Sequence, residues 1–164
     1  MDDHDYMGAA LAQAEEAFAR GDWPVGAVLV NHGMVLALGQ NRQNTLCDMT
    51  VHAETDALRR AQAAHGLPAI AGSTLYCTME PCPMCAWALK IAGVRRLVLG
   101  LRHATLDRID MGGYSIEAFC GMVGFDTLEL TTDVRLDECL EIRRRWGKDQ
   151  VRAAPPSEGD DTVR

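Results

Sequence analysis

The chain has 164 residues, of which 48% are hydrophobic and 24% are charged. At roughly 150 residues per domain, this length predicts one compact domain, and the composition excludes disordered, collagen-like and coiled-coil chains. The formal net charge is −7, from 16 Lys and Arg against 23 Asp and Glu. Because an acidic chain repels a polyanion before any contact forms, this charge argues against nucleic acid as the main partner.

The N-terminal residues 1–5 are acidic, and no apolar run reaches the ~18 residues that cross a bilayer. We therefore expect a cytoplasmic protein without a signal peptide or a membrane partner. In a reducing compartment, closely spaced cysteines indicate metal or redox chemistry more often than disulfides.

The first half of the chain alternates helical and strand-like periodicity. Apolar residues at three- and four-residue steps predict a helix, and two short apolar runs around an Asn-His-Gly turn predict a hairpin. The predicted segments are helix 6–20, strands 25–30 and 34–39, a polar loop 40–50 and helix 51–65.

The second half predicts three more strands and two more helices. Pro83 suits the first turn of a helix, where its missing N–H has no partner to lose, so we expect Cys82 to be the N-cap. Asp133 is expected to cap the last helix, which runs to about Trp146. The predicted segments are strand 73–78, helix 84–92, strand 95–100, an irregular connection 101–124 with some helix, strand 127–130 and the last helix.

This order of elements predicts an α/β fold, a three-layer α/β/α sandwich around a central mixed five-stranded sheet. Residues 1–148 are expected to form the domain. Residues 149–164 combine Pro155, Pro156 and Gly159 with acidic residues and few apolar ones, so they predict a disordered acidic tail.

Two segments that each open a predicted helix carry the chemistry. His52-Ala53-Glu54 offers an imidazole, and Pro81-Cys82-Pro83-Met84-Cys85 offers two thiolates. Three such ligands suit Zn²⁺ and leave one position open to water, as catalytic zinc sites do. Partial positive charge at two helix N-termini would lower the pKa of the thiols. Glu54 is then placed to take a proton from that water.

These two motifs resemble the H-x-E and P-C-x-x-C signature of the cytidine and deoxycytidylate deaminase superfamily. The resemblance covers residues 7–100 and is strongest to the branch of guanine and cytosine deaminases and tRNA adenosine deaminases. It implies a cytidine deaminase-like fold and a zinc-dependent hydrolase that acts on the C–N bonds of cyclic amidines. The further similar segments are 24–30, 41–42, 48–50, 75–80 and 98–100.

The resemblance assigns a metal set and a catalytic acid. His52, Cys82 and Cys85 would bind one Zn²⁺ per chain. Glu54 would be the catalytic residue, which moves a proton from water to the ring nitrogen and then to the leaving amine.

The resemblance also implies substrate contacts. Asn41 would orient the ring by side-chain hydrogen bonds, with Val25 and Trp23 packed beside it. The backbone N–H of Ala53 or of Cys82 would hold the developing oxygen. A homodimer with pockets near its interface is implied as well.

Other interpretations of the motifs remain open. Cys82-Pro83-Met84-Cys85 also resembles the redox motif of glutaredoxin-like proteins, which leaves the placement of His52 and Glu54 unexplained. A non-catalytic, zinc-stabilised binding module is another alternative, and so is a closed structural zinc site with a fourth ligand. The candidates for that ligand lack motif spacing and are expected to be core or surface residues: Cys47, Cys77, Cys120, Cys139, His65 and His103.

Several features favour a small substrate over tRNA. Met49 stands where the tRNA-editing members carry Pro, Trp87 stands where a small residue is usual, and segment 101–115 differs from their loop. A Lys/Arg-rich C-terminal end is also missing, so capture of a folded polyanion would cost more. The main hypothesis is therefore deamination of a free nucleobase or related ring (guanine, cytosine or an aminotriazine) in base salvage, with tRNA-specific adenosine deamination as the alternative.

Residues outside the motifs are expected to have structural roles more often than roles in the site. The run of arginines at 143–145 predicts a solvated helix face, with a phosphate-binding patch as the alternative. Asp107 and Asp110 predict solvated loop acids, which would contact exocyclic amines of the substrate if they are functional. The apolar residues Met84, Trp87, Ala88 and Ile91 lie at helical spacing and predict core or subunit packing, with Trp87 in the pocket wall as the alternative.

Overall fold

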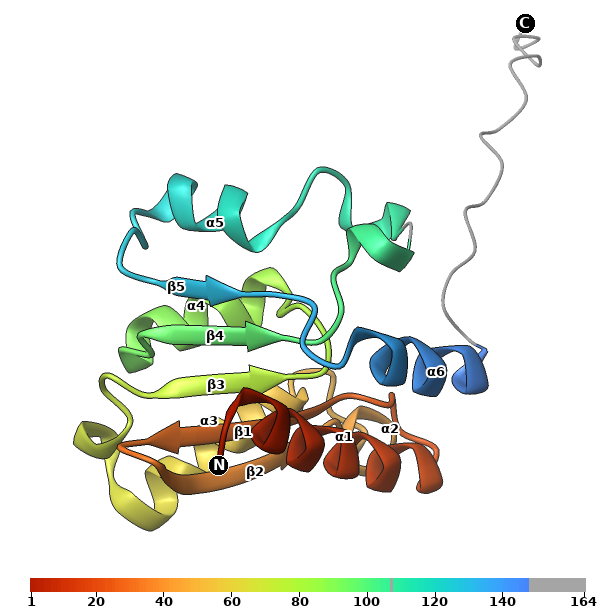
Figure 1. Cartoon of the computed structure of the whole chain (residues 1–164), viewed down its shortest axis with the longest axis horizontal. Coiled ribbons are helices and arrows are strands. Elements are labelled where there is room, and N and C mark those ends of the chain that lie inside the picture. Colours follow the sequence, from red (N-terminus) through yellow and green to blue (C-terminus); the bar gives the residue numbers. More distant parts are fainter. Residues whose placement is uncertain (107, 148–164) are drawn as a thin grey trace, which may run out of the picture.

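The computed structural model describes residues 1–106 and 108–147. Its centre is a five-stranded mixed sheet in the order β2-β1-β3-β4-β5 (Figure 1). Its first two strands form an antiparallel hairpin, β1 is antiparallel to β3, and the last three strands are parallel. The strands are β1 (Gly26–Asn31), β2 (Met34–Gln40), β3 (Thr74–Cys77), β4 (Arg96–Leu99) and β5 (Glu129–Thr131).

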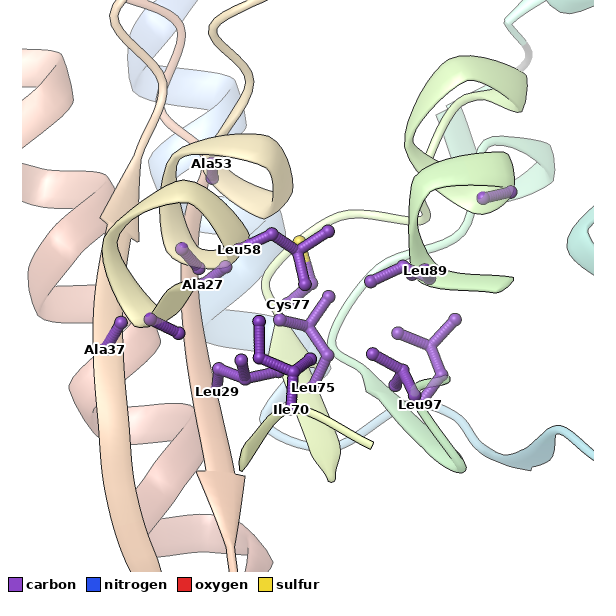
Figure 2. Packing of buried hydrophobic residues seen from close by; sticks show 14 of the residues in the cluster. Ala27, Leu29, Ala37, Ala53, Leu58, Ile70, Leu75, Cys77, Leu89 and Leu97 are labelled. Carbon is purple, nitrogen blue, oxygen red and sulfur yellow. The ribbon is translucent and has the colours of Figure 1, made fainter. Parts of the chain in front are cut away.

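Helices cover both faces of the sheet. The long helices are α3 (Ala53–His65), α4 (Pro83–Ala92) and α5 (Ile116–Val123) on one face and α1 (Asp3–Ala19) and α6 (Leu136–Trp146) on the other. Alternate residues of β1 serve the two cores, with Ala27 and Leu29 in one and Val28 and Val30 in the other. Figure 2 shows the first core, between the sheet and helices α3 and α4. The predicted α/β/α sandwich with a mixed five-stranded sheet is confirmed.

A short helix, α2 (Gln43–Leu46), lies inside the segment expected to be a loop. Buried Asp22 explains it, because its Oδ1 accepts hydrogen bonds from the backbone N–H groups of Asn44 and Thr45, each at 2.9 Å. A carboxylate thus satisfies the free donors of the first turn. Three single 3₁₀ turns complete the secondary structure: η1 (Leu67–Ala69), η2 (Ala104–Leu106) and η3 (Ile109–Met111).

Two helix starts differ from expectation. Helix α1 begins earlier than predicted, because Asp2 and Asp5 form a reciprocal capping box. Asp133 is not the cap of α6. Its φ is 65°, and the N-cap position is taken by Arg135, whose φ is 56°. The two residues with left-handed backbone, Asp133 and Arg135, are separated by Val134 and precede α6 directly. Asp adopts this conformation more readily than most residues.

Helix α3 lies unusually close to β2 at Gly39. A Cβ atom at this position would be 2.1 Å from the carbonyl oxygen of Ala53 and 2.6 Å from the backbone nitrogen of Ala57. Only glycine allows this approach, so Gly39 fixes the depth at which the first turn of α3 packs on the sheet.

The predicted acidic tail, residues 149–164, lies outside the described residues, and so does Asp107. Within the described part of the chain, no helix combines the length and apolar character that a membrane crossing requires.

Candidate active site

The two motifs meet where α3 and α4 begin. Cys82 is the N-cap of α4, with Pro83 as its first residue, as expected. His52 is the N-cap of α3, which begins two residues later than the predicted start at residue 51. Nδ1 of His52 lies 3.6 Å from Sγ of Cys82 and 3.5 Å from Sγ of Cys85. All three ligand atoms lie within 4.8 Å of one another. An imidazole and two thiols at these separations fit the donor set and the reach of a zinc ion.

Of the His, Cys, Asp and Glu side chains that the structure describes, this is the group that could hold a metal ion. The six residues considered as a fourth ligand are not part of it. The described residues therefore provide three protein ligands, as in catalytic zinc sites, and not the four of a closed structural site.

Glu54 lies beside these ligands and is 3% exposed. Burial raises its pKa to about 7, with the charge of His52 opposing this increase and that of Cys82 adding to it. A carboxyl group with a pKa near neutral can both take up and release a proton at physiological pH.

The two cysteines differ sharply in acidity when no metal is bound. The Cys85 thiol and the His52 ring hydrogen-bond the sulfur of Cys82 and lower its pKa to about 4, against the effect of burial. The same contact with Cys82, together with burial, raises the pKa of Cys85 far above its ordinary value. The hydrogen bonds around Cys82 thus favour its thiolate, the form that binds a metal.

A cavity of about 320 Å³ opens next to these groups. Its wall contains the predicted residues Trp23, Val25 and Asn41 as well as His52, Glu54 and Cys82. Ala53 and Cys85 are fully buried behind this wall. The cavity is completed by Gln43, Met79, Glu80, Arg108 and Met111, which were not predicted to belong to a site, and by Met49, His103, Asp110 and Arg143, for which the sequence suggested other or additional roles.

Gln43 holds the side chain of Asn41 in one orientation. Its Oε1 accepts a hydrogen bond from Nδ2 of Asn41 at 3.0 Å, and its backbone N–H donates to Oδ1 of Asn41 at 3.1 Å. Nε2 of Gln43 donates to the carbonyl oxygen of Met49 at 3.2 Å. Because a backbone N–H can only donate, the Asn41 oxygen must face Gln43, and this leaves one amide N–H and one oxygen lone pair of Asn41 that Gln43 does not use.

Arg143 does not lie on a solvated face, as its position in an arginine run suggested. Its side chain lines the cavity at 3% exposure, and its guanidinium lies 5.2 Å from the centre of the Trp23 ring. Burial and the charge of Arg108 lower its pKa to about 10. Arg145, in contrast, is exposed and pairs with Glu15 of α1.

Asp110 is exposed, as expected for a loop acid, and it also lines the cavity. It accepts a hydrogen bond from Nε of Arg108 at 2.7 Å. This ion pair places two opposite charges next to each other in the cavity wall.

Glu80 connects several segments of the cavity wall by hydrogen bonds. Its carboxylate, whose side chain is 1% exposed, accepts hydrogen bonds from Nε of Arg102 at 3.1 Å and from the backbone N–H groups of His103 at 2.9 Å and Ile116 at 2.8 Å. Glu80 comes just before the Cys82 motif in the chain, so one side chain links the metal ligands to the segment that follows β4.

Residues 1–101 match the family model described as the cytidine and deoxycytidylate deaminase zinc-binding region. The chain belongs to this deaminase family. The reaction of the family is hydrolytic deamination at a C–N bond and its cofactor is zinc, for which the described residues contain one suitable group.

This deaminase is 41% identical to a tRNA-specific adenosine deaminase of Agrobacterium fabrum over 107 residues, which are 65% of this chain and 70% of the relative. A solved tRNA:A34 deaminase, studied for A-to-I editing at the wobble position of transfer RNA, has a TM-score of 0.74 and 34% identity and covers 84% of this chain and 98% of its own. A solved guanine deaminase from Nitrosomonas europaea has a TM-score of 0.72 and 27% identity, and the match covers 87% of this chain and 83% of that structure's chain.

The expectation of a free-nucleobase deaminase in base salvage is wrong, because relatives at 34–44% identity are tRNA adenosine deaminases. The argument from net charge failed for a physical reason. A sum over the whole chain does not report how charge is distributed at the site, where Arg108 and Arg143 line the cavity together with Glu54, Glu80 and Asp110. The expectation that nucleic acid is an unlikely partner is corrected with it.

Proposed function

We propose that this deaminase acts on tRNA and converts an anticodon adenosine to inosine with release of ammonia. The observation that carries the proposal is the similarity to tRNA:A34 deaminases, which extends over 84% of this chain and 98% of the solved relative. It therefore extends well beyond the two motifs.

In this proposal His52, Cys82 and Cys85 hold one Zn²⁺, which supplies water that is acidic at neutral pH. Glu54 takes a proton from the attacking water and passes it to the ring nitrogen, then takes the second proton from the added oxygen and gives it to the amine, which leaves as ammonia. The backbone N–H of Ala53 or Cys82 donates a hydrogen bond to the oxygen that replaces the amine. Adenosine and water thus give inosine and ammonia.

Asn41 orients the base through the donor and acceptor that Gln43 leaves free. Val25 and Trp23 pack beside the ring. The cavity of about 320 Å³ suits one base that has been turned out of its stack, as enzymes that modify bases in nucleic acid require. Residues 1–148 then form the complete deaminase unit, since Arg143 of the last helix is part of the cavity wall.

We also propose that the enzyme is a homodimer. Trp87 and Ile91 of α4 are 48% and 67% exposed and lie one helical turn apart, beside a second cavity of about 400 Å³ that Leu67 helps to line. Exposed large apolar side chains next to a groove are typical of a protein interface. A tRNA substrate is consistent with the cytoplasmic location expected from the sequence.

The test is a substrate panel with the zinc-loaded, full-length protein. A tRNA transcript with adenosine at the first anticodon position should gain inosine, measured by mass spectrometry of the digested RNA. The same tRNA with guanosine at that position is the control. Free guanine, cytosine, adenine and aminotriazines should release no ammonia. Ammonia from a free base with unchanged tRNA would reject the proposal, and no turnover of any substrate would favour a binding module.

A further inference from the structure

His103 is a buried side chain on the cavity wall whose ring has no hydrogen-bond partner in the part of the chain that the structure describes. It follows β4, lines the cavity and is 6% exposed. Neither Nδ1 nor Nε2 has a partner among residues 1–106 and 108–147. A buried polar group without a partner costs free energy in the folded state, so such groups are rare and call for an explanation.

The ring is held in place from two sides. The backbone N–H of His103 donates to Glu80 at 2.9 Å, and the ring packs edge-on against Tyr114 with 5.9 Å between ring centres. The Tyr114 hydroxyl in turn donates to the carbonyl oxygen of Pro81 at 2.6 Å. The imidazole is therefore fixed relative to the motif that carries Cys82, without any contact that uses its own nitrogens.

The charge state of this ring bears on what it can bind. Burial lowers the pKa of His103, the Glu80 carboxylate opposes this effect and Arg108 adds to it. A neutral imidazole presents one N–H donor and one lone-pair acceptor. A phosphate oxygen can use the donor alone, whereas a hydroxyl group or the edge of a base can use either nitrogen.

We propose that His103 is a substrate-binding residue whose ring hydrogen-bonds an uncharged polar group of the nucleotide that enters the cavity. This inference rests on the proposed function for the identity of the ligand. It explains why a ring with two unsatisfied nitrogens is held rigidly in the wall of the site, since the partner arrives with the substrate.

Two variants separate hydrogen bonding from packing. His103→Phe keeps a planar ring of similar size and removes both nitrogens, and His103→Asn keeps a donor and an acceptor but fills less space. Each is made in zinc-loaded Glu54→Gln protein, so that binding is measured without turnover. Dissociation constants are determined for an anticodon stem-loop with adenosine at its first anticodon position.

We expect His103→Phe to weaken binding about 10-fold or more and His103→Asn to weaken it less. A purely structural ring would give the opposite order, and that order would overturn the proposal. So would unchanged binding by His103→Phe. Exposed His65, in the last turn of α3, provides the control His65→Phe. Equal zinc content and equal thermal unfolding show that each variant is folded.

The dependence of binding on salt identifies the group that is contacted. Loss of a neutral hydrogen bond lowers affinity equally at every salt concentration, so the slope of log Kd against log salt stays unchanged. A smaller slope would mean that a phosphate contact has been lost and would overturn the proposal. Wild-type protein that edits no tRNA would refute the proposed function instead, and the same variants titrated with the base or nucleoside that it does deaminate would then decide the role of His103.

Discussion

Glu54 is a carboxyl group that burial poises near neutral pH, with a pKa of about 7. Replacement by glutamine keeps its size and leaves His52 and the two cysteines in place, but the side chain can no longer exchange a proton. We expect Glu54→Gln to retain one zinc per chain and to lower kcat by roughly 10²- to 10⁴-fold. Elemental analysis and single-turnover rates measure the two effects.

The matched control is Glu129→Gln, which neutralises an exposed acid paired only with exposed Arg95 in the described structure. It should leave kcat unchanged. If the kcat of Glu54→Gln stays within a few-fold of the wild type, Glu54 does not transfer the proton. If the variant loses zinc, its lower activity reports the missing metal and not the missing carboxyl group.

At the scale of elements, Glu80 joins the loop before α4 to the segment after β4 and to the first turn of α5. Glu80→Gln keeps an acceptor but removes the charge that Arg102 and two backbone N–H groups require. We expect the free energy of unfolding to fall by about 2–3 kcal/mol, since hydrogen bonds to buried charge are strong. Urea unfolding of the zinc-loaded protein measures this change.

Glu117 offers a control on the same arginine, because it also pairs with Arg102 but its side chain is 55% exposed. Glu117→Gln should cost less than about 1 kcal/mol. Equal losses for the two variants would contradict the view that burial makes Glu80 the stronger anchor.

The contact of α3 with β2 predicts a second effect at this scale. The methyl group of Gly39→Ala would meet backbone atoms of Ala53 and Ala57, which cannot rotate away, so α3 must move off the sheet. Since His52 and Glu54 lie at the start of that helix, we expect lower kcat together with a loss of roughly 1–3 kcal/mol in stability. Activity assays and urea unfolding test both.

Gly121 in α5 is the control, because a methyl group there meets nothing within 4 Å. Gly121→Ala should leave activity unchanged and should stabilise the helix by up to about 1 kcal/mol. Full activity and stability of Gly39→Ala would show that the two elements have more freedom than their packing implies.

At the scale of the whole molecule, Asp3 fastens α1 across the sheet. Its carboxylate accepts hydrogen bonds from Arg96 at 2.9 and 2.7 Å and from the Tyr76 hydroxyl at 2.9 Å. The hydrogen bond from Arg96 lowers the pKa of Asp3 below 3.8 against the effect of burial, and Tyr76 lowers it further. The stabilisation is therefore present above pH 3.8 and is lost as the pH falls through the lower pKa of the folded state.

We expect Asp3→Asn to be less stable than the wild type by about 1 kcal/mol at pH 7, because both side chains of the ion pair are about one-third exposed. The difference should disappear at a pH below the pKa of the folded state. Urea midpoints across pH 2.5–7 measure it, with exposed Asp126→Asn as the control. A gap that persists in acid would show that Asp3 acts through packing and not through its charge.

The residues of the metal group were predictable from sequence because their placement is local. Cys82 is an N-cap because Pro83 follows it, and His52 and Glu54 share the first turn of one helix. The five strands and two layers of helices were also legible as periodicity. Helix α2 was not, because its first turn is satisfied by Asp22, which lies 22 residues from Asn44.

The sequence by itself determined the chemistry of this protein: a zinc ligand set, a buried acid beside it and the sandwich that presents them. Only the tertiary structure decided which residues complete the cavity, because Glu80, His103 and Arg143 line it from segments that are far apart in the chain. Arg143 lies beside Trp23 only because α6 packs against α1. Composition sums charge over the chain, whereas recognition depends on where folding puts it, and for that reason net charge misjudged the substrate.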